Sequence, residues 1–217
     1  MIRLSGRLNE LFNAIPSTDG TVVDIGCDHG KLIVAAVLSG KCAHGIGVDI
    51  SKRSLSKAIE YADKCGAGDR VDFFEGDGFS PVNGKISCAI IAGLGGIEIA
   101  KILSAPHECD CYVLSPHQDA HFLRSYMREN GLLAQKDFVV YDKNKFYPII
   151  VAVKGECDYS DEELFLGKNL PQSEDYTRRN DLRLEYIRKI RNNCEGSISD
   201  DLAKESEALE KWQKSRT

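Results

Sequence analysis

Residues 22–30 combine glycines with side chains that can carry a charge or a proton. An apolar run ends at Gly26, and Asp28 and His29 follow before Gly30. A glycine loop between a strand and a helix brings the backbone close to a ligand, and the free N–H groups of the helix then point at that ligand. The alternative is an ordinary strand–turn–helix whose glycines only serve the turn. Two further acidic positions favour the ligand-binding interpretation.

Both acidic positions come directly after later apolar runs. Asp49 stands 23 residues after Gly26 and is followed by Ile50. A carboxylate there can accept both ribose hydroxyls of an adenosine. Asp77 lies directly before Gly78 and can reach an adenine amino group. A solvated acid and a plain turn are the alternatives. The pattern predicts an adenosine-containing cofactor bound by Gly26, Asp28, His29, Asp49, Ile50, Asp77 and Gly78.

The charge of the first loop distinguishes between two such cofactors. The dinucleotide pattern G-x-G-x-x-G is absent, because Cys27, Asp28 and His29 follow Gly26. Asp28 would repel a pyrophosphate, whereas it would attract the ammonium group of S-adenosylmethionine. The sequence therefore favours S-adenosylmethionine.

Another glycine-rich segment follows the apolar residues 87–91. Ala92 and Gly93 are expected to border the cofactor, at the point where methyl donor and target atom meet. Gly95 and Gly96 are expected to leave the pocket wall without side chains, so that a flat base can slide against the backbone. The alternative is a glycine-rich turn into a helix.

The elements that must position these loops can be read from the alternation of β-branched runs and helical segments over residues 20–153. Strands are expected at 21–26, 44–50, 70–76, 87–93 and 111–116, and apolar residues on both faces predict a parallel sheet covered by helices. Residues 132–142 and 145–155 are joined only by Lys143 and Asn144, so they should pair antiparallel. Five parallel units that end in a hairpin predict the Rossmann-like α/β fold of class I S-adenosylmethionine methyltransferases.

The composition places this domain within residues 1–155 and a smaller helical domain within 156–217. Ser160, Ser173 and Ser199 are expected to cap helices, with Gly196 ending the second, so that the tail forms a helical hairpin. On the middle helix, Leu182, Tyr186 and Ile190 are expected to form the apolar stripe.

The chain of 217 residues has a net charge of −5, which does not indicate a nucleic-acid binder but leaves room for a local basic patch. It shows neither a signal peptide nor a membrane-spanning run, so we expect a cytoplasmic protein without membrane contact. The eight cysteines are scattered and expected to be reduced. The spacing of His107, Cys109 and Cys111 does not fit a zinc knuckle, so no metal is expected.

Five segments together resemble the TrmK family of bacterial tRNA (adenine-N1)-methyltransferases, which modify adenine 22. They are DIGCDHGKL, IAGLGG, LSPHQD, KFYPI and LSGRLNELFNAIP, and the similarity covers about residues 2–154. It implies a class I Rossmann-like domain with a C-terminal helical, coiled-coil-like extension, with S-adenosylmethionine as cofactor and tRNA as partner. The carry-over matches Gly26, Asp28 and His29 to the first cofactor loop, Asp49 to the ribose acid, Asp77 and Gly78 to the adenine loop, and Ala92, Gly93, Gly95 and Gly96 to the methyl-transfer loop.

One position departs from the family. Ser115, Pro116 and His117 stand where Q-P-N is usual, and His117 must replace the hydrogen bonds of the asparagine. Asp28 and His29 are the candidates to take a proton from the methylated base. Histidine can both donate and accept, so His117 joins them as a candidate catalytic residue.

The target base must leave its pair to expose N1. Tyr147 or Phe146 could stack on it. The alternative for both is a core position in the last strand, which is expected more for Phe146. For tRNA phosphates, the candidates lie on one basic segment, residues 176–193, with a solvated helix face as the alternative. They are Arg178, Arg179, Arg183, Arg188, Lys189 and Arg191. Arg3 and Arg7 could add contacts.

Three functions stay open from the sequence. The first is methylation of adenine 22 of tRNA by a monomeric enzyme. The second is a methyltransferase of the same fold that acts on another RNA or a small molecule. The third is a non-catalytic RNA-binding module that retains the fold.

Overall fold

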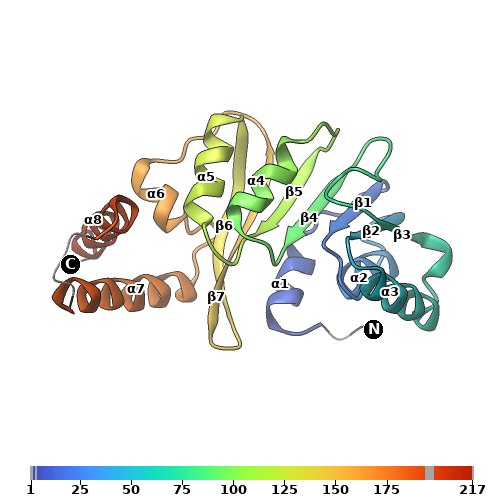
Figure 1. Ribbon diagram of the computed structural model, residues 1–217, viewed down its shortest axis with the longest axis horizontal. Coiled ribbons are helices and arrows are strands. Elements are labelled where there is room, and N and C mark those ends of the chain that lie inside the picture. Colours follow the sequence, from blue (N-terminus) through green and yellow to red (C-terminus); the bar gives the residue numbers. More distant parts are fainter. Residues whose placement is uncertain (1, 3, 194–197, 217) are drawn as a thin grey trace.

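The computed structural model describes residue 2, residues 4–193 and residues 198–216, and these residues form one seven-stranded sheet flanked by helices (Figure 1). Arg3 and Gly196 lie outside the described residues. The strands are β1 (Thr21–Ile25), β2 (His44–Asp49), β3 (Val71–Glu75), β4 (Cys88–Ala92), β5 (Cys111–Ser115), β6 (Leu132–Asp142) and β7 (Lys145–Lys154). The helices are α1 (Gly6–Ala14), α2 (Lys31–Leu38), α3 (Lys52–Cys65), η1 (Gly68–Arg70), α4 (Gly96–Ser104), α5 (Ala120–Glu129), α6 (Asp161–Leu166), α7 (Glu174–Asn193) and α8 (Asp200–Lys214).

The sheet has the strand order β3-β2-β1-β4-β5-β7-β6. Strands β1 to β5 pair in parallel, and β7 pairs antiparallel with both β5 and β6. The expected parallel sheet with a closing hairpin is therefore confirmed. Because parallel strands end at the same edge, the loops after β1, β2, β3, β4 and β5 all lie at the carboxyl edge of the sheet.

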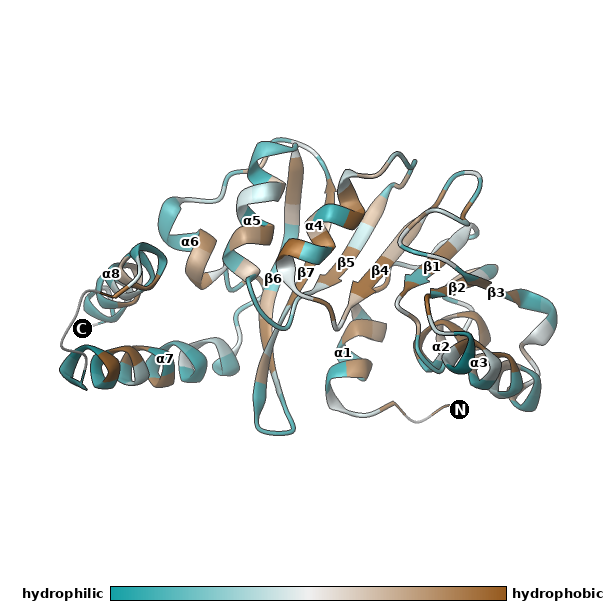
Figure 2. Ribbon diagram, in the orientation of Figure 1, coloured by the Kyte–Doolittle hydropathy of each residue, from teal (hydrophilic) through white to brown (hydrophobic). Residues whose placement is uncertain are grey.

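The core has one layer on each face of the sheet. Helices α1, α2 and α3 cover one face, where Leu11, Ile33 and Ile90 are fully buried. Helices α4 and α5 cover the other face, where Ile99 and Leu123 are fully buried. Figure 2 shows that apolar residues concentrate along the central strands β4 and β5. This double coverage explains why those strands read as nearly continuous apolar runs.

The C-terminal helices lie beside the β6 edge of the sheet, at the opposite end from β3 (Figure 1). Ser160 and Glu163 form the expected capping box of α6, and Ser199 caps α8. Ser173 accepts the Asp175 N–H at 3.2 Å at the start of α7. The serine caps predicted from the sequence are therefore confirmed.

The expected apolar stripe on α7 is wrong. Leu182 and Tyr186 are 48% and 54% exposed, and the buried face of α7 is formed instead by Tyr176, Asn180, Leu184 and Ile187. These residues pack against α8 and the β6–β7 hairpin in a third apolar cluster. The true stripe includes a buried asparagine, and for that reason an apolar pattern did not reveal it.

A buried ion pair fastens the tail to the main domain. Arg124 on α5 is fully buried and makes two hydrogen bonds to Asp137 on β6, at 2.8 and 3.0 Å. The Asp137 carboxylate also accepts the Tyr159 hydroxyl at 2.8 Å and the Lys168 N–H at 3.2 Å. Arg124 donates to the carbonyl of Leu164 at 3.1 Å. The segment after β7 is therefore attached to the sheet through hydrogen bonds between buried polar groups.

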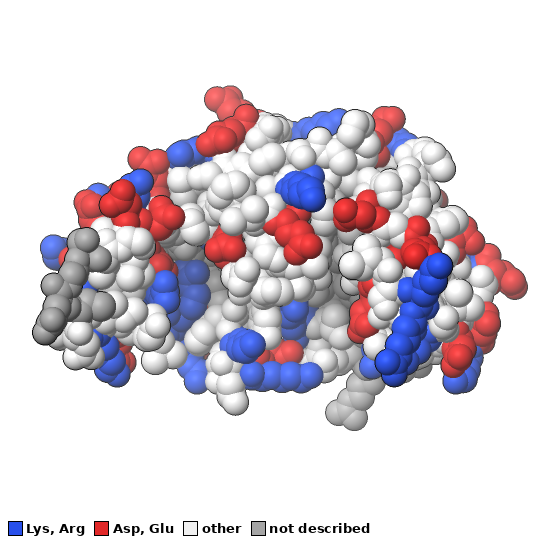
Figure 3. All heavy atoms as spheres, viewed as in Figure 1, with Lys and Arg blue, Asp and Glu red and all other residues white. Residues whose placement is uncertain are grey.

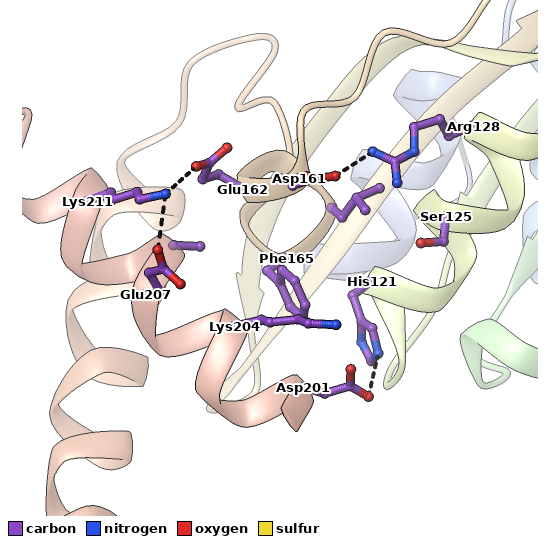
Figure 4. Close-up of a pocket in the computed structure, with 12 residues that line it drawn as sticks. His121, Ser125, Arg128, Asp161, Glu162, Phe165, Asp201, Lys204, Glu207 and Lys211 are labelled. Atoms are coloured by element: carbon purple, nitrogen blue, oxygen red, sulfur yellow. Dashed lines mark hydrogen bonds and ion pairs between the residues drawn. The ribbon is translucent and has the colours of Figure 1, made fainter. Parts of the chain in front are cut away.

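A cleft of about 530 Å³ separates α5 from α6 and α8 (Figure 4). Its lining alternates acidic and basic side chains, and ion pairs cross it: His121 lies 3.6 Å from Asp201, and Lys211 lies 2.9 Å from Glu162. Within the residues described, no helix is both long and apolar enough to span a membrane.

Candidate active site

The loop after β1 folds back over the end of β2. Gly26 and Cys27 both donate their backbone N–H groups to the carbonyl of Val48. Asp28 has a left-handed backbone, with φ +48°, and donates its N–H to the Asp49 carboxylate at 2.9 Å. At Gly26, φ is +75° and an added Cβ would meet no atom within 4 Å. The first glycine of the motif therefore faces open space at the carboxyl edge of the sheet.

Three carboxylates gather beside this open space. Asp24 on β1 is buried, and Asp28 and Asp49 lie near it. Burial, followed by the charges of Asp49 and Asp28, raises the pKa of Asp24 to about 7. In the part of the chain that the structure describes, no Lys or Arg forms an ion pair with these three acids. The cluster therefore carries negative charge that no cationic side chain balances.

Asp28 and His29, both expected to be catalytic, contact each other. The His29 Nδ1 lies 2.6 Å from an Asp28 carboxylate oxygen, and the Ser54 hydroxyl donates to the other oxygen at 3.3 Å. The His29 side chain is 39% exposed. A carboxylate at Nδ1 fixes the ring so that Nε2 faces outward and is free to accept a proton.

The loops after β2 and β3 meet as expected. Asp49 accepts the Ser51 N–H at 2.8 Å, and its carbonyl accepts the Gly76 N–H at 3.1 Å. Ile50 is 74% exposed, an unusual position for isoleucine, and Asp77 is exposed at the same edge. Gly78 differs, because it is buried and a Cβ there would contact Ile102 at 3.3 Å. Its role is therefore to pack the loop, and Asp77 is the side chain that faces outward.

The loop after β4 combines one open glycine with two that pack against a neighbouring loop. Gly93, next to the half-buried Ala92, has φ +88° and open space around an added Cβ. Gly95 and Gly96 were expected to leave room for a base, and the structure instead places the loop after β5 against both of them. A Cβ on Gly96 would overlap the Asp119 carbonyl and lie 2.7 Å from its carbon, and one on Gly95 would lie 3.3 Å from Gln118. These two glycines admit the loop after β5 instead of a ligand.

That contact joins the loops after β4 and β5. The Ser115 carbonyl accepts the Gly93 N–H at 3.2 Å, and the His117 N–H donates to the Leu94 carbonyl at 3.1 Å. The His117 side chain is exposed. The ends of β1 and β5 are separated by β4, about 10 Å at the usual strand spacing. His117 therefore stands apart from the Asp28–His29 pair, on the other side of Gly93.

Arg7, expected to contact RNA, is turned inward. Its guanidinium donates to the Ser115 carbonyl and hydroxyl, both at 3.2 Å, and lies 4.5 Å from the centre of the Tyr147 ring. Burial lowers the pKa of Arg7. One face of Tyr147 is thus covered by Arg7. Arg7 and Tyr147 therefore pack together and support the end of β5 at Ser115.

Three of the arginines on α7, Arg178, Arg179 and Arg183, have different surroundings. Arg183 forms a two-pronged ion pair with Glu205 on α8, with distances of 2.7 and 2.8 Å. Arg179 donates to the Leu166 carbonyl and to the Asn180 side chain, and burial lowers its pKa to about 10. Arg178 is exposed and lies 4.2 Å from the centre of the Tyr141 ring. Only Arg178 among the three offers an unburied charge without an ion-pair partner among the residues described.

A second cleft, of about 390 Å³, lies between the loop after β5 and the C-terminal helices. His117, Phe146, Pro148, Arg179 and Arg183 contribute to its lining. Phe146, expected in the core, is only half-buried and lines this cleft. A path therefore leads from His117 toward α7.

Sequence reasoning missed Asp24. The signal was an aspartate inside the apolar run of β1, a position where an acid costs free energy unless it serves a purpose. For metals, no group of three or more His, Cys, Asp or Glu side chains is placed to hold an ion within the residues described.

Strand order, glycine loops and clustered acids together define a Rossmann-like methyltransferase domain. The family model described as "Methyltransferase domain" matches residues 4–150, so this chain belongs to the methyltransferase-domain family. The enzyme class and the fold predicted from the sequence are confirmed.

Related proteins agree with this assignment. The chain is 30% identical over 155 residues to "Putative tRNA methyltransferase MG248" of Mycoplasma genitalium, covering 68% of this chain and 69% of that protein. Two solved structures share its fold at 21% identity. TrmK of M. capricolum in complex with S-adenosylhomocysteine has a TM-score of 0.86, covering 96% of this chain and 97% of that one. The m1A22 tRNA methyltransferase TrmK of B. subtilis has a TM-score of 0.80, covering 99% and 97%. The resemblance drawn from the motifs is thus confirmed by the fold.

Proposed function

We propose that this protein transfers a methyl group from S-adenosylmethionine to N1 of adenine 22 in tRNA. The names of its relative and of the two TrmK structures support the substrate. On this chain itself, one observation carries the proposal: three carboxylates, none paired with a Lys or Arg among the described residues, lie beside open backbone at the carboxyl edge of the sheet. Such a site suits a ligand that combines an ammonium group, a sulfonium and an adenosine.

The residues present fit this cofactor. Gly26 and Gly93 leave room for it, and Asp24 and Asp28 would attract its ammonium group. Asp49 uses one lone pair of each carboxylate oxygen for a backbone N–H, so a second lone pair on each remains for the ribose hydroxyls. Ile50 would cover one face of the adenine, and the exposed Asp77 would accept a hydrogen bond from the adenine amino group. Gly78 shapes the loop that carries Asp77, and Ala92 would line the cofactor site next to Gly93.

S-adenosylmethionine supplies an electrophilic methyl group when it is bound. The lone pair of adenine N1 needs little activation, so the protein contributes mainly by orienting the base. His117 is placed to hydrogen-bond the base from the side of β5, and Phe146 lines the cleft beside it. In this scheme Tyr147 acts indirectly. Arg7 packs over the Tyr147 ring and donates to the Ser115 carbonyl, and Ser115 lies two residues before His117, so Tyr147 helps to keep His117 in place.

The methylated base is a cation that can lose a proton from N6. Asp28 holds His29 through Nδ1, so Nε2 is the atom that accepts this proton. Asp28 then stabilises the imidazolium by its charge. In this scheme Asp28 lies close to the cofactor ammonium group and to His29, so it contributes both to cofactor attraction and to proton removal.

One observation favours a second candidate. The motif Ser115–Pro116–His117 replaces the Q-P-N that is usual in the family, and His117 offers a different hydrogen-bonding geometry from asparagine. Methylation of another RNA or of a small molecule by the same fold is therefore the competing function.

The primary proposal further implies a monomeric protein that meets tRNA in the cytoplasm, with catalysis in residues 1–155 and tRNA contacts extending into 156–217.

The test is transfer of a radiolabelled methyl group to unmodified tRNA transcripts, with the site mapped by primer extension. We expect a stop at position 22 and no incorporation into a transcript whose adenine 22 is replaced by guanine. Asp28→Ala should lose most activity, and His117→Ala should raise KM for tRNA or lower kcat without weakening cofactor binding. A stop at another position, or equal labelling of the guanine transcript, would reject the proposed substrate.

A further inference from the structure

The β6–β7 hairpin projects beyond the carboxyl edge of the parallel sheet. Leu114, next to the end of β5, pairs with Ile150, whereas the β6–β7 ladder continues to Asp142 and Lys145. The ladder therefore runs about five residues further, or roughly 16 Å at 3.3 Å per residue. This is the same edge that carries the glycine loops, so the hairpin tip stands beside the path that a large substrate must take.

Basic and aromatic side chains meet at this tip. Lys143 and Lys145 are exposed, and the left-handed residues Lys143 and Asn144 form its tight turn. The rings of Tyr141 and Phe146 lie 4.9 Å apart between centres, and Arg178 from α7 lies over Tyr141. We call Tyr141, Lys143, Lys145, Phe146 and Arg178 the hairpin patch. Figure 3 shows Lys and Arg side chains gathered at the lower edge of the molecule, over the end of the hairpin.

The three cations of the patch are available for binding. Among residues 4–193 and 198–216, no carboxylate forms an ion pair with Lys143, Lys145 or Arg178. Two acidic side chains close to the patch in sequence are engaged with the backbone: Asp142 accepts the Arg7 N–H at 3.2 Å and Asp175 accepts the Tyr141 N–H at 2.8 Å. These acids reduce the positive potential but leave the three cationic groups exposed.

The remaining cations of α7 already have partners. Arg183 pairs with Glu205 and Arg191 with Glu210 on α8, Lys189 pairs with Glu185, and Arg188 donates to Gln213. A phosphate that bound these groups would have to replace an existing contact. The basic sequence of α7 therefore serves mainly to hold the two C-terminal helices together.

The hairpin patch is continuous with the cleft at His117. Phe146 contacts Tyr141 in the patch and also lines the cleft, together with Arg179 and His117. A chain of nucleotides whose target base enters beside His117 would pass Phe146 and reach the exposed cations at the tip. Flat rings beside Lys and Arg are the combination that recognises unpaired nucleotides, through stacking and phosphate contacts.

From these observations we propose that the hairpin patch binds the RNA backbone that flanks the target adenine, and that the cations of α7 beyond Arg183 do not. The inference rests on the proposed tRNA substrate and adds to it the surface that holds the strand. Lys143, Lys145 and Arg178 contact phosphates, while Tyr141 and Phe146 form the wall against which a neighbouring base stacks.

The test compares two variants with the same change of charge. The hairpin variant carries Lys143→Gln, Lys145→Gln and Arg178→Gln, and the control carries Arg188→Gln, Lys189→Gln and Arg191→Gln. Affinity of the full-length protein for an unmodified tRNA transcript is measured by fluorescence anisotropy between 50 and 200 mM KCl, about the range in which phosphate contacts dominate the salt dependence. Thermal unfolding with and without S-adenosylmethionine verifies that each variant folds.

We expect the hairpin variant to lower the slope of log K against log salt by about 2 to 3, since each phosphate contact contributes roughly 0.7 to 0.9. The control should keep the wild-type slope. Equal losses in both variants, or a larger loss in the control, would overturn the inference while the wild type still binds tRNA. A wild type that neither binds nor methylates tRNA would instead overturn the proposed function.

Discussion

Replacement of Asp24 by asparagine tests the electrostatic basis of the site. Asp24 is buried beside Asp28 and Asp49, and these surroundings raise its pKa from 3.8 to about 7. The native state therefore binds a proton more tightly than the unfolded chain between about pH 4 and pH 7. Stability conferred by the protonated form is present at low pH and is lost as pH rises toward 7.

The size of the effect follows from the shift. About 3 pKa units at 1.36 kcal/mol each set an upper bound near 4 kcal/mol for the penalty of the ionised carboxylate. Asp24→Asn keeps the shape and cannot ionise. Relative to wild type, the variant should therefore gain about 2–4 kcal/mol in the free energy of unfolding on going from pH 4 to pH 8.

Two assays measure the consequence. Urea unfolding of both proteins at pH 4, 5, 6, 7 and 8 gives the change in stability, and calorimetry gives the affinity for S-adenosylmethionine. The wild-type affinity should rise by up to about tenfold per pH unit below 7, because a cationic ligand prefers the ionised carboxylate, whereas the variant should bind weakly without this dependence. Parallel stability curves for the two proteins would refute the reasoning about Asp24.

Three further predictions concern other parts of the account. Gly96→Ala must displace the Asp119 backbone and should lower the midpoint of thermal unfolding by several degrees. Gly93→Ala meets no atom but strains the left-handed backbone at φ +88°, so it should lower the midpoint less and also weaken cofactor binding measured by calorimetry; a larger loss of stability at Gly93 than at Gly96 would contradict the close packing of Gly96. Arg124→Met leaves the Asp137 charge buried without its partner and should cost about 3–5 kcal/mol in urea unfolding, and a loss below about 1 kcal/mol would contradict it. Arg7→Ala should reduce kcat about tenfold, equivalent to 1.36 kcal/mol, with unchanged cofactor affinity. An effect confined to KM for tRNA would contradict this and indicate that Arg7 contacts the RNA directly.

Much of the fold followed from local patterns. The β-branched runs and the two-residue connection at Lys143 and Asn144 fixed the parallel strands and the antiparallel hairpin, because strand pairing depends on connection length. The loops after β1 and β2 also met as expected, since Asp28 follows β1 and Asp49 ends the adjacent parallel strand β2.

The site was harder to predict where contacts join distant segments. Gly95 and Gly96 look identical to ligand-facing glycines in the sequence, and only the approach of the Asp119 loop reveals their packing role. Arg7 reads as an exposed base on an amphipathic helix, yet tertiary packing turns it onto Ser115. On α7, Arg183 and Arg191 are paired with Glu205 and Glu210 of α8, which lie more than a dozen residues further along the chain.

The most direct measurement is a crystal structure of the protein with S-adenosylmethionine or S-adenosylhomocysteine bound. The account predicts the amino-acid end of the ligand beside Asp24 and Asp28, the ribose on Asp49, and the sulfur next to Gly93. Ligand density in the charged cleft between α5, α6 and α8, with the edge at Gly26 and Gly93 unfilled, would contradict it.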